Sequence, residues 1–225
     1  MDFFPLYNSL RIAIIATIII FFVGIFFAYY IARLPVVIKG IIDVILTLPL
    51  VLPPTVVGYI LLIFFSPKRP FGAFLNNVFG INIMMTWWAG IFASVVVAFP
   101  LMYRTARGAF ESFDEDLAYA GETLGLSNIY IFWFIRIPYI AKTLVAGVIL
   151  SFARALGEYG ATSMVAGYTP GKTATISTTV YQLWRINDEK GAIYWVIINI
   201  IISSIFLLIL NNIERSNKNN VKSKN

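Results

Sequence analysis

The sequence has no cysteine and no histidine, and only 12% of its 225 residues are charged. The absence of cysteine excludes disulfide bonds and thiolate sites. The absence of histidine removes the commonest metal ligand and the commonest general base, and no other cluster of catalytic side chains stands out. The sequence therefore predicts a chain that is not an enzyme and that holds no metal and no cofactor.

Apolar residues are abundant, since 59% of the chain is hydrophobic. Five segments are apolar over about the 20 residues that cross a bilayer. They cover residues 12–31, 41–65, 83–103, 139–160 and 192–210. We expect an all-α integral membrane domain of about five transmembrane helices over residues 8–212, followed by a polar tail over 213–225. Pro49, Pro53 and Pro54 predict that the second segment bends or breaks within the membrane.

The basic residues predict the orientation of these helices. If the N-terminus lies outside, the inner side holds Arg33, Lys39, Arg104, Arg107, Arg136, Lys142, Arg215, Lys218, Lys222 and Lys224. The outer side then holds fewer: Arg11, Lys68, Arg69, Lys172, Arg185 and Lys190. Because positive charge gathers in cytoplasmic loops, we expect a multi-pass protein of the cell membrane with its C-terminus inside.

The longest charged interruption between apolar segments is the loop 111–138. Ser112 and Glu115 predict a capping box at the start of a helix. Gly125 is expected to end that helix, because glycine adopts positive φ at little cost. Ser127 would cap a second short helix, and Pro138 would mark the start of the next span.

The first helix of this loop has an apolar face. Steps of four, three and four place four apolar side chains on it: Phe113, Leu117, Ala120 and Leu124. Such a face needs a partner. It either lies on lipid headgroups or docks on a soluble protein, and spacing alone leaves both alternatives open.

Arg154 and Glu158 are ionisable residues expected within the fourth span, four residues apart on one face. Ionisable residues at membrane depth are candidates for function, so the pair is either a gate or a neutralised pair that fixes helix packing. Hydroxyl groups expected near them would offer neutral hydrogen bonds to a transported anion. The candidate pathway residues are therefore Thr55, Ser151, Arg154, Glu158, Thr162 and Ser163.

The segment Gly167–Thr173 reads GYTPGKT and looks like a phosphate-binding loop. The nucleotide-binding motif needs four residues between its glycines, and here there are three. It also lies between two membrane segments instead of between a strand and a helix. We therefore expect no nucleotide site, and ATP-driven transport would need an ATPase on another chain.

Within the loop, Tyr119-Ala120-Gly121, then Gly125, then Ile135-x-Ile137-Pro138 resembles the cytoplasmic signature of binding-protein-dependent ABC importer permeases. That signature reads Glu-Ala-Ala, three residues, Gly, nine residues, Ile, one residue, Leu, Pro. The spacing is met throughout, while Tyr119 stands in place of Glu and Gly121 in place of Ala. Four further stretches are similar to the molybdate permease subfamily: LPLVLPPTVVGYILL, FPLMYRTARGAFE, FARALGEYGAT and PGKTATI.

The resemblance implies the type I importer permease fold, with a cytoplasmic coupling helix in the loop 111–138. It implies a homodimer, two copies of a cytoplasmic ABC ATPase and an external molybdate-binding protein, with no nucleic acid partner. The residues that it assigns to ATPase coupling are Phe113, Asp116, Leu117, Ala120, Gly121, Leu124, Gly125 and Pro138.

The expected function is the membrane-spanning permease subunit of an ATP-driven molybdate importer. A tungstate or sulfate permease of the same class is the nearest alternative, because these dianions differ little in size. An ion-coupled secondary transporter is the alternative from another class, but it would need its own coupling site within the spans.

Overall fold

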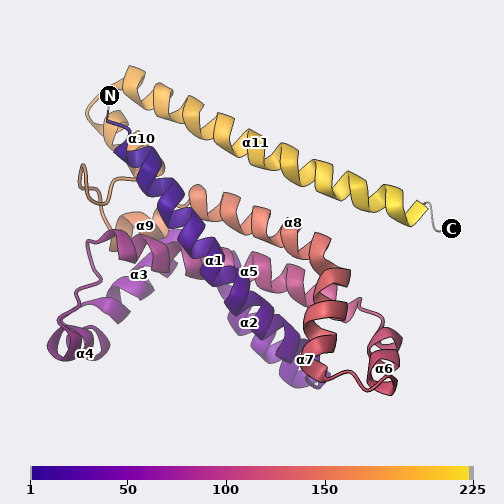
Figure 1. The fold of residues 1–225 in the computed structure, drawn as a ribbon. Helices are drawn as coiled ribbons and strands as arrows, with labels where there is room; N and C mark the ends of the chain where they lie inside the picture. The colour runs from indigo at the N-terminus through magenta and orange to yellow at the C-terminus, as the bar shows by residue number, and fades with distance from the viewer. Residues whose placement is uncertain (1, 223–225) are drawn as a thin grey trace.

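A computed structural model describes residues 2–222 and consists of helices joined by turns over that range (Figure 1). The long helices are α1 (Phe4–Ala32), α5 (Trp87–Glu111), α8 (Ile137–Leu156) and α11 (Glu189–Lys222). Within these described residues, four stretches are long and apolar enough to cross a membrane, or five if one bent pair is a single span. The expectation of an all-α chain with about five membrane helices is confirmed.

The second apolar segment is broken into α2 (Val36–Val51) and α3 (Pro54–Phe65), which meet at 108°. The break falls at Leu52 and Pro53, whose backbones are extended, with ψ of 140° and 134°. A proline disfavours helical conformation in the residue before it, so the Pro53-Pro54 pair ends α2 and starts α3. The predicted break is confirmed, while Pro49 lies inside α2 without ending it.

The core lies where α1, α5 and α8 pack together. Small residues bring these helices close, as they do in membrane proteins generally. A Cβ atom on Gly24 of α1 would lie 3.0 Å from Cγ of Met102, and one on Gly147 of α8 would lie 2.9 Å from its Sδ. Met102 of α5 is itself fully buried, so the three helices meet around this side chain.

A second apolar cluster joins α3, α5 and α9 (Gly160–Val165). A Cβ atom on Gly58 of α3 would lie only 2.8 Å from Cα of Ala161. One on Gly160 would lie 2.9 Å from Cβ of Pro54. The second half of the broken span therefore packs backbone to backbone against the short helix that follows α8.

Some element boundaries differ from the expected ones. The fourth span ends at Leu156 and begins at Asn128, because α7 (Asn128–Ile131) and a π-helical turn (Phe132–Arg136) run directly into α8. Pro138 therefore lies inside a continuous helical span, near the start of α8, and does not mark the start of a separate helix.

The polar connections also contain helices, namely α4 (Pro70–Phe79) and α10 (Ile176–Arg185). The helix α11 continues to Lys222, into the segment expected to be a polar tail. Residues 223–225 of that tail lie outside the described residues.

Candidate functional site

The loop between α5 and α8 folds as a short hairpin of α6 (Glu115–Thr123) and α7, at the end of the bundle opposite the N-terminus (Figure 1). Gly125 has φ of +80°, and Leu126 N donates to the carbonyl of Gly121 at 3.1 Å, which closes the C-terminus of α6. Ser127 Oγ accepts from Tyr130 N at 3.3 Å and caps α7. The predicted turn at Gly125 and the cap at Ser127 are confirmed.

The predicted capping box of Ser112 and Glu115 is wrong. Helix α5 extends through Glu111, so Ser112 is its C-terminal cap residue. Asp114 caps α6 instead, since its Oδ1 accepts from Asp116 N at 3.0 Å. The acidic residues still lie in the first turn of α6, where the helix dipole favours negative charge.

Glu115 bonds to a distant residue. Its carboxylate oxygens accept from Nη1 and Nη2 of Arg136 at 2.7 and 2.6 Å. The guanidinium of Arg136 also lies 4.8 Å from the ring centre of Phe113. Hydrogen bonding from Arg136 holds the pKa of Glu115 below its ordinary value. This bidentate pair fixes the start of α6 to the span that follows it.

The side chains of the hairpin divide into a buried and an exposed set. Phe113 is 5% exposed and packs edge-on against Tyr139, with ring centres 5.2 Å apart. A Cβ atom on Gly121, which is buried, would lie 3.2 Å from Cγ1 of Ile131. Leu117 is 41% exposed and Leu124 is 80% exposed.

The expectation that Phe113 shares one face with Leu117, Ala120 and Leu124 is therefore wrong. Phe113 precedes the first turn of α6, so it does not follow the helical period, and it packs into the chain's own core. Ala120 and Asp116 are exposed together with Leu117 and Leu124. The outer surface of α6, defined by Asp116, Leu117, Ala120 and Leu124, is the part of the expected coupling set that is free to meet a partner.

A polar cluster that sequence reasoning missed joins α2 to the end of α5. Asp43 accepts a hydrogen bond from the hydroxyl of Tyr103 and forms an ion pair with Arg107. Lys39 Nζ lies 2.9 Å from Oε1 of Glu111. The sequence signal that could have revealed this cluster is Asp43, a carboxylate inside the apolar run 41–65. The cluster ties α2 to the helix turn directly before α6.

Arg154 and Glu158 bond as expected, with Nη1 and Oε2 2.7 Å apart. The expected placement on one helical face is wrong, because α8 ends at Leu156 and Glu158 lies in the turn before α9. Its second oxygen accepts from Ala161 N at 2.7 Å, and the residue is only 3% exposed. Both carboxylate oxygens therefore hold the turn between α8 and α9.

The remaining pathway candidates lie in different surroundings. Ser151 and Thr162 are buried, and Ser151 Oγ has no hydrogen-bond partner among the described residues. Ser163 Oγ donates to the carbonyl of Gly160 at 3.0 Å. Thr55 is exposed on α3. Three of these residues therefore lie at the α3–α9 contact, and Ser151 lies in the helix that leads to it.

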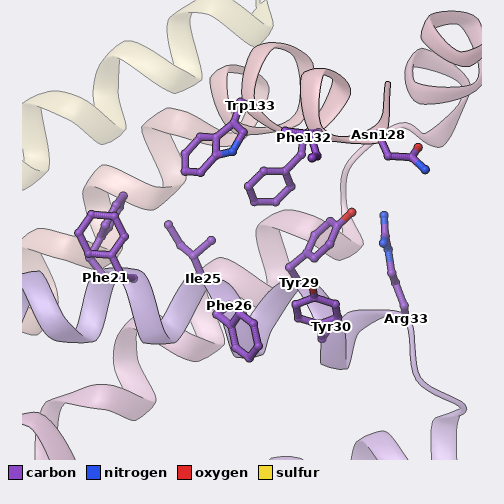
Figure 2. A pocket seen from close by; sticks show the side chains of 11 residues that line it. Phe21, Ile25, Phe26, Tyr29, Tyr30, Arg33, Asn128, Phe132 and Trp133 are labelled. Atoms are coloured by element: carbon purple, nitrogen blue, oxygen red, sulfur yellow. The ribbon is translucent and has the colours of Figure 1, made fainter. Parts of the chain in front are cut away.

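An aromatic groove of about 460 Å³ runs between α1 and the α7–π-helical segment (Figure 2). Phe21, Ile25 and Phe26 line it from α1, and Phe132 and Trp133 line it from the opposite side. Arg33 and Asn128 lie at the end of the groove near the hairpin. The guanidinium of Arg33 is 3.9 Å from the ring centre of Tyr29. Such an apolar lining suits lipid or protein better than a hydrated ion.

Comparisons with known proteins agree with the observed fold. Residues 20–218 match the family described as "Binding-protein-dependent transport system inner membrane component". The chain is 39% identical over 202 residues to the Molybdenum transport system permease protein ModB of Escherichia coli strain K12, covering 89% of this chain and 88% of the relative. It is 35% identical over 202 residues to the protein of the same name from Haemophilus influenzae, covering 89% of this chain and 88% of the relative.

A solved structure also has this fold at much lower sequence identity. It is a bacterial ABC transporter involved in the import of the acidic polysaccharide alginate, which superposes with a TM-score of 0.73 at 18% identity. The alignment covers 95% of this chain and 78% of that one. The helical arrangement is therefore that of the transmembrane subunits of such importers.

Proposed function

This chain belongs to the family of binding-protein-dependent transport system inner membrane components, and we propose that it is the membrane-spanning permease subunit of an ATP-driven molybdate importer. It lies in the cell membrane as a multi-pass helical protein. The molybdate assignment is supported by relatives that are named for molybdenum transport and that align over most of their length.

The observation that carries the transport role is the outer surface of α6. Leu117 and Leu124 expose apolar surface at one end of the bundle, while Arg136 and Gly121 hold the helix from behind. An exposed apolar surface on a rigidly held helix is typical of a docking site. We propose that it docks on a separate cytoplasmic ATPase, so that ATP hydrolysis takes place on that partner and not on this chain.

The assembly that follows is two copies of this chain, two copies of the ATPase and an extracytoplasmic molybdate-binding protein. The N-terminus would lie outside and the C-terminus inside. Closure of the ATPase pair would move α6 as a rigid body. The Glu115–Arg136 pair would pass that movement to α8, and the Asp43–Arg107 pair would pass it from α5 to α2. The α3–α9 contact lies at the far ends of α2 and α8 and would separate or close in response.

ATP-dependent uptake of labelled molybdate by proteoliposomes containing the complete complex tests this function. Uptake should require ATP, the ATPase and the binding protein together. Competition by unlabelled tungstate and sulfate tests the alternative cargoes: if sulfate is transported and molybdate is not, the molybdate assignment is wrong. Uptake driven by an ion gradient without ATP would contradict the assignment of this chain to an ATP-driven importer of any cargo.

A further inference from the structure

The loop 167–175 lies against the first turns of α1, at the end of the bundle opposite α6 (Figure 1). Asn8 Nδ2 donates to the carbonyl of Ala174 at 2.9 Å, and Ser9 Oγ accepts from Ile176 N at 2.8 Å. Both contacts are buried. The segment that resembles a phosphate-binding loop is therefore fixed to α1 and is not a free connection.

The turn within this loop is tightly formed. The carbonyl of Thr169 accepts from the backbone N–H groups of Lys172, Thr173 and Ala174 at 3.0 to 3.1 Å, within the hydrogen-bonding range. Gly171 has φ of +69°, a conformation that glycine adopts without strain. Thr173 is buried, and its Oγ1 accepts from Thr169 N at 2.9 Å, which leaves the hydroxyl hydrogen available to donate.

A cavity of about 370 Å³ lies between this turn, α1 and the start of α5. Its lining includes Arg11, Thr86, Trp87, Gly171, Lys172 and Thr173. No acidic residue of the described part of the chain lines it. The cavity therefore combines two cations with hydroxyl groups, and nothing in its lining neutralises them.

Arg11 is held in place without being neutralised. Its guanidinium lies 3.9 Å from the ring centre of Trp87, and Nη2 donates to Asn8 Oδ1 at 2.8 Å. Its Nε is buried and has no hydrogen-bond partner among residues 2–222. Within that range Lys39, Arg107, Arg136 and Arg154 all form ion pairs, whereas neither Arg11 nor Lys172 does.

We propose that this cavity binds a tetrahedral oxyanion. A guanidinium that is already oriented by a ring and an amide offers its N–H groups to anion oxygens, and the Lys172 ammonium adds a mobile point charge. The Thr173 hydroxyl supplies a neutral donor. The choice of molybdate as the ligand rests on the proposed function, whereas the preference for an anion rests on the cavity alone. Because Lys172 is exposed, a bound anion would stay in contact with water, and binding would be weak enough for release, as transport requires.

The test is equilibrium binding of sodium molybdate and sodium sulfate to the full chain in phosphatidylcholine nanodiscs, at constant ionic strength set with sodium chloride. No ATPase, binding protein or ATP is present, so the result does not depend on transport. The proposal predicts saturable binding of both oxyanions. Lys172→Gln and Arg11→Gln should each weaken binding at least tenfold, while Lys68→Gln, a basic residue outside the cavity, should leave it unchanged.

Absence of saturable binding to the wild type would overturn the proposal, as would equal affinity in Lys172→Gln. An equal loss in Lys68→Gln would also overturn it, because it would indicate diffuse attraction by surface charge. Arg11→Lys distinguishes a loss of charge from a loss of folding, because it keeps the positive charge at this position. This variant should bind molybdate more tightly than Arg11→Gln does. Phosphatidylglycerol nanodiscs test a lipid phosphate as the occupant, and loss of molybdate binding there would contradict a site for a free anion. If the chain binds molybdate but the complete complex shows no ATP-dependent uptake, the proposed function is wrong and the proposed binding site is still supported.

Discussion

The guanidinium of Arg136 and the carboxylate of Glu115 form a two-bond pair across 21 residues of sequence, with both nitrogen–oxygen distances under 2.8 Å. Arg136 is 7% exposed and lies in the π-helical turn that leads into α8, while Glu115 is the first residue of α6. The pair is therefore the direct polar link between the exposed helix and the transmembrane bundle.

Glu115→Gln should loosen this link. The loss of a charge-assisted pair beside a buried guanidinium should cost about 1–2 kcal/mol, at the lower end because Glu115 itself is half exposed. Thermal unfolding of the purified chain measures this as a fall in Tm of a few degrees. Glu122→Gln, an exposed residue of the same helix with no ion pair in the described chain, is the control and should unfold as the wild type does.

The pair also predicts a pH dependence. Because the pKa of Glu115 is lowered in the folded chain, its contribution is fully present above the ordinary pKa of a glutamate, about 4.3. That contribution is lost as the pH falls through the lower, folded-state pKa. The Tm difference between wild type and Glu115→Gln should therefore be constant near neutral pH and shrink in acid. A difference that grows in acid would mean that the pair does not stabilise the fold.

Leu117→Asp should abolish co-purification of the ATPase. Leu117 is 41% exposed, so the substitution should leave the fold of the chain intact while placing a charge in the proposed docking surface. Glu122→Gln is the control, because it also changes the charge by one, and Glu122 is exposed on α6 but lies on the side away from Leu117 by helical period. Retention of the ATPase by Leu117→Asp, or its equal loss in both variants, would argue against this surface.

Exchange of Arg154 and Glu158 should not restore function. The exchange would re-form an ion pair, but it would leave Ala161 N without the acceptor that Glu158 Oε1 now provides. A buried N–H without a partner costs about 1–3 kcal/mol. The double exchange should therefore transport as poorly as Glu158→Ala, whereas Glu158→Gln, which keeps a carbonyl acceptor, should transport better than either. Wild-type uptake by the exchanged chain would show that the pair only balances charge.

The features that sequence reasoning predicted correctly are those decided by local backbone chemistry. Pro53-Pro54 breaks its span and Gly125 adopts positive φ, because each depends on the residue itself and its neighbours. Phe113 was misplaced because one helix was assumed to begin two residues earlier than it does. Because α6 begins at Glu115, Phe113 lies outside the helix and packs in the core instead.

The contacts between distant residues were beyond prediction from spacing. Glu115 pairs with Arg136, and Asp43 on α2 with Tyr103 and Arg107 on α5. No periodicity links such residues, since their contacts depend on how the helices pack. Glu158 was recognised as a candidate from its charge within an apolar region, but its second bond, to Ala161 N, required knowledge of where α8 ends.

The most direct test of the coupling surface uses the absence of cysteine from the chain. A single Leu124→Cys substitution places a thiol at the C-terminal cap of α6, at a position that is 80% exposed. In sealed vesicles that carry the complete complex, a membrane-impermeant maleimide should label this thiol only from the cytoplasmic side, and more slowly when the ATPase is bound. Labelling from the external side, or at a rate that the ATPase does not change, would contradict the account.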